Sequence, residues 1–138
     1  MRKLALAVAV VAAAVALPMG GAAAVSPTFR LALIHTVSGC HTWMRDTKTL
    51  GPSTKIVVKP ATQLKIRLNC PMDFDFVQVA GPRLALGARR TYAGTIRTIV
   101  LRKPGVYKLA VTNVQTSVER NLQTLGPDNK LALTIVVR

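Results

Sequence analysis

The chain has few acidic side chains and few groups that transfer protons. Of its 138 residues, 5 are Asp or Glu, 19 are Lys or Arg and 2 are His, which gives a net charge of +14 at pH 7. It contains no Gly-rich phosphate loop, no His-Glu-x-x-His and no Ser nucleophile in a recognisable turn. General acid–base catalysis needs a positioned base beside the reacting group. We therefore expect that the protein is not an enzyme.

Cysteine is equally scarce, with 2 residues, Cys40 and Cys70, and no Cys-x-x-Cys motif. That absence argues against a thiol-redox protein. Helical signals are also missing beyond the N-terminal segment, because no window there carries apolar residues at a 3.6-residue period. The sequence has no internal repeat and no linker, and its length suits one small domain.

The longest apolar run lies at the N-terminus. It extends from Leu4 to Leu17, follows the basic pair Arg2-Lys3 and precedes the small residues 22–24. That order is typical of a secretory signal peptide, and about 14 apolar residues are too few to cross a bilayer. We expect a signal peptide over residues 1–24 and a mature domain over residues 25–138. The mature domain would be exported, periplasmic or extracellular, and without a transmembrane segment.

The mature chain has the pattern of short β-strands separated by turns. Leu64, Ile66 and Leu68 alternate with Lys65 and Arg67, which is the period of a half-buried strand. The other stretches of β-forming residues are 29–33, 56–58, 74–79, 95–102, 106–112 and 131–137. Seven or eight such strands with turn signals between them predict an all-β fold, a sandwich of two sheets.

Two parts of the chain resemble the cupredoxin family, and together they cover roughly residues 50–113. The first part rests on Pro52, Ile56, Val58, Leu64, Ile66, Leu68 and Asn69. In the second, Pro104-Gly105-Val106-Tyr107 and the alternating residues after it resemble the penultimate strand of the family. Pro60-Ala61 stands where the family usually has a glycine turn. The resemblance implies a Greek-key β-sandwich, often with one copper ion bound at one end for electron transfer.

The usual copper ligands of that family are not matched. The family places a His near Asn69, but the loop there is Cys70-Pro71-Met72-Asp73-Phe74. It places a Cys four residues after the Tyr of the Pro-Gly-x-Tyr turn, where this chain has Val111. No Cys, His or Met follows Val111. The thiolate and both imidazoles of a blue-copper site are therefore missing.

The soft donor side chains of the mature chain gather in two short stretches. These are His35, Cys40, His41 and Met44 in the first, and Cys70 and Met72 in the second. In the family that this chain resembles, the first and third strands are parallel neighbours, so the resemblance implies that both stretches emerge at the same end. It thereby places Cys40 near Cys70, with His41 and Met72 close by.

Two outcomes compete for the cysteine pair. In an oxidising compartment, Cys40 and Cys70 would form a disulfide that closes a loop of about 30 residues, worth roughly 3–4 kcal/mol. Alternatively, Cys40, His41, Cys70 and Met72 would bind copper, since thiolate, imidazole and thioether suit that metal. The same sulfur atoms cannot serve both. We favour the disulfide and no cofactor, with copper as the alternative.

The individual residues also have plainer interpretations. We expect His35 to be hydrogen-bonded near the end of the first strand, and His41 to be either a surface side chain in a loop or a ligand. Trp43, the only tryptophan, would cover the disulfide or the core. Met72 is expected to fill the core rather than to bind a metal.

The charge predicts an anionic partner. Without residues 1–24 the chain keeps 17 basic and 5 acidic side chains, a net charge of +12, which attracts polyanions. Arg89, Arg90, Arg102 and Lys103 fall near predicted loops and would form an anion-binding patch, whereas basic residues within strands would be a solvated face. The expected partners are anionic cell-envelope polymers or lipid headgroups. Specific nucleic-acid binding is not expected, because the 6 aromatic residues fall mostly at core-like positions.

Our first hypothesis is an exported, non-enzymatic, cupredoxin-like binding or structural module, stapled by a Cys40–Cys70 disulfide and without the usual copper site. The first alternative is a copper-binding protein, for copper handling or electron transfer, that uses the relocated donors Cys40, His41, Cys70 and Met72. The second alternative is a basic module that binds polyanions of the cell envelope.

Overall fold

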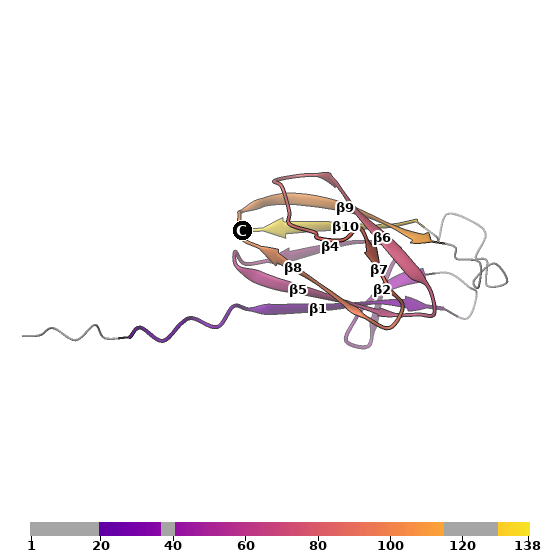
Figure 1. Cartoon of the computed structure of the whole chain (residues 1–138), viewed down its shortest axis with the longest axis horizontal. Coiled ribbons are helices and arrows are strands. Elements are labelled where there is room, and N and C mark those ends of the chain that lie inside the picture. The colour runs from indigo at the N-terminus through magenta and orange to yellow at the C-terminus, as the bar shows by residue number, and fades with distance from the viewer. Residues whose placement is uncertain (1–19, 37–40, 115–129) are drawn as a thin grey trace, which may run out of the picture.

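The computed structural model describes residues 20–36, 41–114 and 130–138, which form strands and no helix (Figure 1). In chain order the strands are β1 (Thr28–His35), β2 (His41–Arg45), β3 (Lys48–Gly51), β4 (Ser53–Val58), β5 (Thr62–Asn69), β6 (Asp73–Ala80), β7 (Arg90–Thr91), β8 (Ile96–Leu101), β9 (Gly105–Val114) and β10 (Lys130–Val137). Within this part of the chain, no helix has the length and apolarity needed to span a bilayer.

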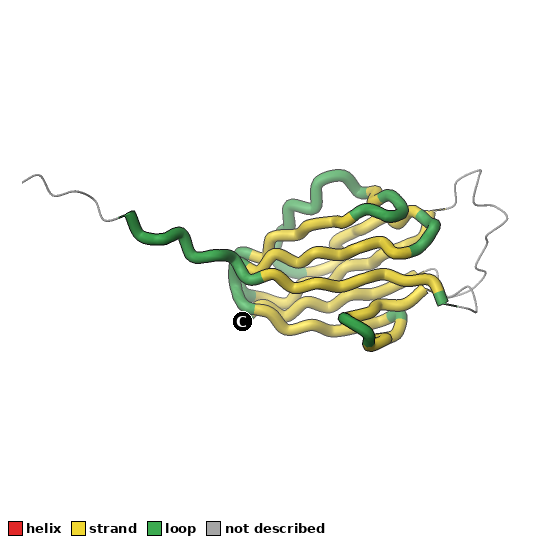
Figure 2. The backbone as a smooth tube through the Cα atoms, turned by 90° about the horizontal axis from the view of Figure 1, so that it is seen from below, coloured by secondary structure: helices red, strands yellow, loops and turns green. Residues whose placement is uncertain are grey.

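The strands form two five-stranded sheets that face each other (Figure 2). Sheet A has the order β3-β2-β1-β5-β8, and sheet B has the order β4-β10-β9-β6-β7. In sheet A, β1 is parallel to β5, and in sheet B, β4 is parallel to β10, while the other neighbouring strands are antiparallel. The predicted all-β sandwich is thus confirmed, and the mixed sheets agree with a cupredoxin-like architecture. The parallel pairing of the first and third predicted strands is also confirmed.

Each of the seven predicted stretches coincides with a strand, but the expected number of seven or eight strands was too low. Three further strands are present among the described residues: β2, β3 and β7. β2 lacks the alternating pattern because His41, Thr42 and Trp43 are all buried. β7 has only two residues, which are defined by their pairing with Phe74 and Asp75 and not by a local pattern.

Alternate residues of the two sheets meet in one core. On β5, Leu64, Ile66 and Leu68 are fully buried, whereas Arg67 between them is exposed. Leu131, Leu133, Ile135 and Val137 on β10, with Tyr107, Leu109 and Val111 on β9, form much of the opposite wall. Burial of each such side chain contributes about 1.5–3 kcal/mol. The face of each strand that carries these apolar residues therefore turns inward.

Trp43 joins the two sheets near the point where the chain crosses between them. Its indole is fully buried, and Nε1 donates a hydrogen bond of 3.0 Å to the carbonyl oxygen of Ala132 on β10. Close by, the chain passes from β3 of sheet A to β4 of sheet B through Pro52, whose carbonyl accepts a hydrogen bond from Ala132 N at 3.0 Å. Of the two positions expected for Trp43, the structure confirms the core.

The turn before β9 packs against the turn after β6. The Tyr107 hydroxyl donates a 2.5 Å hydrogen bond to the carbonyl of Lys103, an arrangement like the tyrosine corners of other β-sandwiches. Gly81 lies directly against this turn with φ of +103°, and a Cβ there would lie 2.3 Å from the carbonyl oxygen of Val106. Only glycine fits this close approach.

Candidate functional site

One end of the sandwich holds the described soft donors that the sequence singled out, with the exception of Met44. At this end β1 finishes, β2 begins and β5 turns into β6. Because β1 and β5 are parallel and in register, Ile34 lies opposite Asn69. The next residues along the chain are His35, the last of β1, and Cys70, which follows β5. His41 opens β2 as the register partner of His35. We call this region the histidine end.

The two histidines of the chain contact each other there. His35 Nδ1 and His41 Nε2 lie 3.3 Å apart, and the rings meet edge to face with centroids 5.0 Å apart. His41 is 1% exposed and packs edge to face on Phe74, whereas His35 is exposed. The expectation of a surface side chain in a loop was wrong for His41, because the residue is buried and pairs as the first residue of β2. The expected hydrogen-bonding position of His35 is consistent with this contact.

The other donors lie on the turn between β5 and β6. The Cys70 thiol donates to the carbonyl oxygen of Met72 at 3.7 Å. Met72 is buried, as expected of a core residue, and its Sδ accepts a 2.7 Å hydrogen bond from Asn113 Nδ2 on β9. Cys40 lies outside the described residues, so the disulfide and the four-residue copper site both stay predictions. Among the residues that the structure does describe, no three His, Cys, Asp or Glu side chains form a group that could hold a metal.

The blue-copper site of the cupredoxin family does not fit this chain. Val111, at the position of the copper-binding thiolate, is fully buried and lies in register between Phe76 on β6 and Leu131 on β10. The turn that would carry an imidazole provides Cys70 and Met72 instead. A hydrocarbon side chain in the core cannot coordinate copper.

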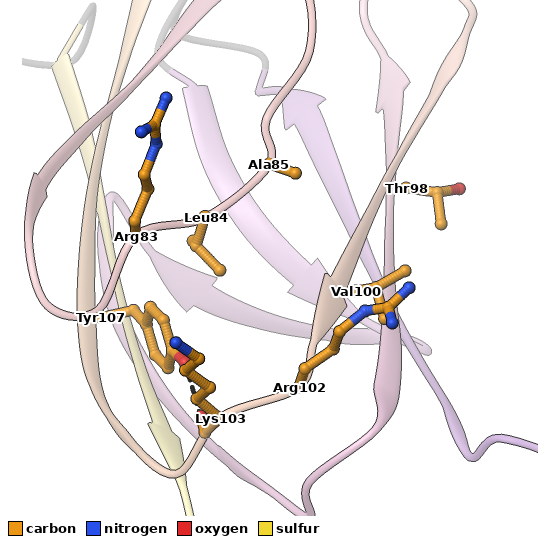
Figure 3. Close-up of a pocket in the computed structure, with 8 residues that line it drawn as sticks. All are labelled: Arg83, Leu84, Ala85, Thr98, Val100, Arg102, Lys103 and Tyr107. Atoms are coloured by element: carbon orange, nitrogen blue, oxygen red, sulfur yellow. Dashed lines mark hydrogen bonds between the residues drawn. The ribbon is translucent and has the colours of Figure 1, made fainter.

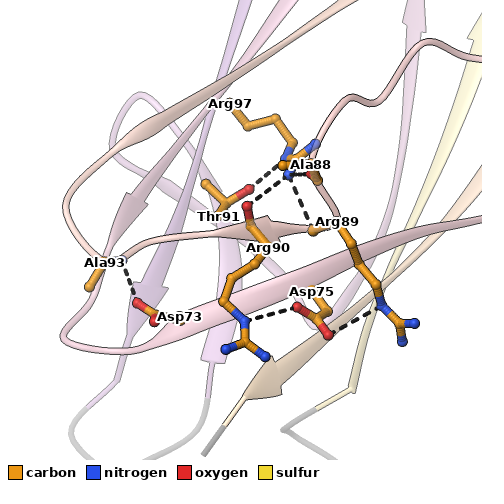
Figure 4. A network of polar contacts seen from close by, with 8 residues as sticks. All are labelled: Asp73, Asp75, Ala88, Arg89, Arg90, Thr91, Ala93 and Arg97. Atoms are coloured by element: carbon orange, nitrogen blue, oxygen red, sulfur yellow. Dashed lines mark hydrogen bonds and ion pairs between the residues drawn. The ribbon is translucent and has the colours of Figure 1, made fainter. Parts of the chain in front are cut away.

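A second polar centre, missed by the sequence analysis, surrounds Arg97 on β8 (Figure 4). Its side chain is buried, with the guanidinium 4.8 Å from the ring centroid of Phe76. Nε donates to the hydroxyl of Thr91 at 2.5 Å, and Nη1 donates to the carbonyl of Leu86 at 2.5 Å. Nη2 donates to the carbonyls of Ala88, Arg89 and Arg90. Burial lowers the pKa of Arg97, and the nearby Asp75 carboxylate opposes that shift.

Two of the predicted anion-binding residues belong to this centre. Arg89 Nε lies 3.2 Å from Asp75 Oδ2, and Arg90 Nε lies 3.3 Å from Asp75 Oδ1. The structure therefore pairs both with an internal carboxylate, as Figure 4 shows. The Asp75 carboxylate offsets part of the positive potential that Arg89 and Arg90 present to an external anion.

The other two predicted residues lie toward the opposite end of the sandwich. Arg102 and Lys103 follow β8 and line a hollow of about 250 Å³ with Arg83 and the ring of Tyr107 (Figure 3). In Figure 3 the guanidinium of Arg83 points away from the side chains of Arg102 and Lys103. The four predicted residues thus do not form one patch: the structure divides them between two places.

A different group of cations occupies the outer surface of sheet A. Arg30 on β1 lies directly opposite Lys65 on β5, and Arg67 follows two residues after Lys65. With Ile96 of β8 these side chains border a shallow hollow of about 140 Å³. We call Arg30, Lys65 and Arg67 the basic face. The alternation along β5 predicted that Lys65 and Arg67 face solvent, but it did not reveal that Arg30 joins them.

Comparisons with known proteins give structural likenesses only. No protein-family model matches the chain. No curated protein is significantly similar to it in sequence. Solved structures of similar shape include a multicopper oxidase from Campylobacter jejuni, with 16% identity and a TM-score of 0.43 over 80% of this chain and 25% of that one. Another multicopper oxidase has 10% identity and a TM-score of 0.45 over 80% of this chain and 41% of that one.

A third similar structure is the cysteine protease inhibitor EhICP2 from Entamoeba histolytica, with 14% identity and a TM-score of 0.36 over 62% of this chain and 86% of that one. The chain spans only 25% and 41% of the length of the two oxidases. Neither the identities nor the TM-scores link this chain to the activity of those proteins.

Proposed function

We propose that this protein is an exported, non-enzymatic binding module of cupredoxin-like fold, stapled by a Cys40–Cys70 disulfide, that holds an anionic partner on its basic face. The partner would be a polymer or a lipid surface of the cell envelope that carries phosphate or carboxylate groups. The observation that carries the proposal is the register of β1 and β5, which brings three cations together on one surface, with no ion pair to an acid in the part of the chain that the structure describes.

This arrangement opposes folding. Arg30 and Lys65 are register partners on strands about 4.8 Å apart, and like charges directly opposite each other destabilise a sheet. Among the described residues, none of the three ion pairs involves the basic face: Asp75 pairs with Arg89 and Arg90 on sheet B, and Asp46 lies by Arg45. An external anion would relieve this repulsion.

The surroundings of the basic face suit a broad contact. Ile96 and Val100 on β8 project from the same surface and are exposed. Cations beside exposed apolar side chains suit an anionic layer that has both charged and apolar parts. The mature net charge of +12 would add long-range attraction at low salt.

The test compares two neutralised variants of the mature protein. Arg30→Gln, Lys65→Gln and Arg67→Gln together remove the basic face. The expected loss of affinity is about 3 kcal/mol, roughly 100-fold, at about 1 kcal/mol for each cation. Two probes, inorganic polyphosphate and phosphatidylglycerol vesicles, distinguish a soluble polymer from a lipid surface. Binding to the favoured probe should weaken steeply between about 50 and 200 mM salt.

The control removes the same charge from the other sheet. Lys55, Lys108 and Lys130 lie on the outer surface of sheet B, and their replacement by Gln changes the net charge equally. Binding by this variant should fall much less than in the basic-face variant. Equal losses in both would mean that the partner senses only net charge, and the assignment to sheet A would be wrong.

The copper-binding alternative keeps one specific observation in its favour, namely the contact between His35 and His41. His35 lies on the opposite face of β1 from Arg30, so this contact is separate from the basic face.

A further inference from the structure

We infer that His35 and His41 form a chelating pair for one divalent late transition-metal ion, Cu²⁺, Zn²⁺ or Ni²⁺, at the histidine end. This site differs from the family's copper site, whose residues are absent, and from the predicted set of Cys40, His41, Cys70 and Met72. It rests on the geometry of two described side chains and does not depend on the proposed binding of anions. Imidazole nitrogen is a preferred ligand for these three metals.

The separation of the two nitrogens fits a shared ion. At the usual metal–nitrogen distance of about 2.0–2.1 Å, the 3.3 Å between His35 Nδ1 and His41 Nε2 corresponds to an angle of about 105–110° at the metal. That angle is close to tetrahedral, the geometry that Zn²⁺ adopts in most protein sites. The two nitrogens therefore need little movement to receive an ion.

The orientation of the rings points the same way. The centroids are 5.0 Å apart, only 1.7 Å farther than the 3.3 Å between the nitrogens, and the rings are inclined by 72°. Two rings that met head-on along a straight line would add a full ring radius on each side to the nitrogen distance. The shorter centroid distance shows that the two rings do not meet head-on, and a bent arrangement is what two imidazoles that share one ion require.

The burial of the pair provides both a fixed ligand and a route of entry. His41 is buried in β2 and packs edge to face with Phe74, so its ring has little rotational freedom. His35 is exposed at the end of β1, so an ion would reach the pair from solvent. Water would complete the coordination, since no third described His, Cys, Asp or Glu joins the pair in a metal-binding group. An open site of this kind suits exchange of the ion more than permanent storage.

Isothermal titration of the metal-stripped mature protein with Cu²⁺ and with Zn²⁺ tests the inference. We expect one ion per chain with micromolar affinity, and at least tenfold weaker binding in His35→Ala. This variant is chosen because the exposed ring of His35 contributes little to the core, whereas replacement of buried His41 risks unfolding. Asn69→Ala is the matched control, since Asn69 is an exposed residue at the same end of the sandwich, and it should bind metal like the parent.

Two further readouts keep the result unambiguous. Electron paramagnetic resonance of the Cu²⁺ form should show two coupled imidazole nitrogens in the parent and one in His35→Ala. The double variant Cys40→Ser, Cys70→Ser should keep its metal affinity. Unchanged affinity in His35→Ala would overturn the inference, and so would binding that disappears only with the two sulfur atoms. Loss of polyanion binding in the basic-face variant, with metal binding intact, would show that the two proposals stand or fall separately.

Discussion

Ala61 shows how a single residue carries a local energetic penalty. It follows Pro60 in the turn between β4 and β5, and its φ of +65° lies in the left-handed region. Thr62 N donates to the carbonyl of Lys59 at 3.3 Å, which closes a four-residue turn with Pro60 second and Ala61 third. A turn with proline as its second residue and a positive φ at its third residue has type II geometry, and glycine is favoured at that third residue. The resemblance to the cupredoxin family had already set this pair apart, because that family usually has a glycine turn there.

We therefore predict that Ala61→Gly stabilises the protein. The left-handed conformation costs a residue with a Cβ about 1–2 kcal/mol, and the added entropy of glycine in the unfolded chain offsets about half of that. The expected gain in the free energy of unfolding is about 0.5–1 kcal/mol, measured by urea denaturation. Ala132→Gly is the control, because Ala132 lies in β10 and does not have a positive φ. That variant should lose a similar amount, and a gain in both would contradict this explanation.

Among the secondary-structure elements, Arg97 holds the long connection between β6 and β7 at the edge of the sandwich. The segment between β6 and β7 has no strand of its own, yet the guanidinium binds three of its carbonyls, those of Leu86, Ala88 and Arg89. It also binds the carbonyl of Arg90 at the start of β7. The side chain starts on β8 at the edge of sheet A, while β7 belongs to the edge of sheet B. One cation thus links the edges of both sheets through backbone acceptors.

Replacement of this cation should loosen the segment without removing the strands. For Arg97→Met, which keeps the hydrocarbon stem, we expect the free energy of unfolding to fall by about 2–4 kcal/mol, because several acceptors lose a charged donor. Hydrogen exchange should accelerate in residues 84–91 before it does so in β5 or β9. Arg67→Met is the matched control on the other face of sheet A, where we expect a change within about 0.5 kcal/mol. Uniform acceleration over all strands would contradict a local role.

The two kinds of arginine on sheet A also show what the sequence pattern revealed and what it did not. The alternation of Leu64, Ile66 and Leu68 correctly placed Arg67 toward solvent. Arg97 has the same phase as buried Ile99 and Leu101, so the period of two residues pointed inward. A charged side chain is costly at a buried position unless acceptors are provided for it, and residues 86–91 provide those of Arg97.

For the whole molecule, the predicted disulfide would close the histidine end. Cys70 follows Asn69, which is paired with Ile34 on β1, and His41, the residue after Cys40, is paired with His35. The neighbours of both cysteines in sequence thus lie at the same end of the sandwich. This supports the pairing inferred from the resemblance.

We predict that protein purified from an oxidising compartment begins at Val25 and contains the Cys40–Cys70 disulfide. Its intact mass should lack residues 1–24 and be lower by two hydrogen atoms than that of the reduced chain. Reduction should lower the free energy of unfolding by roughly 3–4 kcal/mol, as the loop of about 30 residues implies. Cys40→Ser, Cys70→Ser should show the same loss and no response to a reductant. Two titratable thiols in the oxidised preparation would refute the disulfide.

The strands whose side chains alternate and the turns at glycine and proline follow from the amino-acid sequence alone. So does the presence of Val111 where cupredoxins carry the copper-binding thiolate. These properties depend on neighbouring residues, because the side-chain period of a strand is local. Three contacts become evident only in the folded chain: His35 with His41, Arg30 opposite Lys65, and Arg97 with residues 86–91. Those contacts depend on how strands and connections pair in space, and the register of that pairing is set by the packing of both sheets over one core.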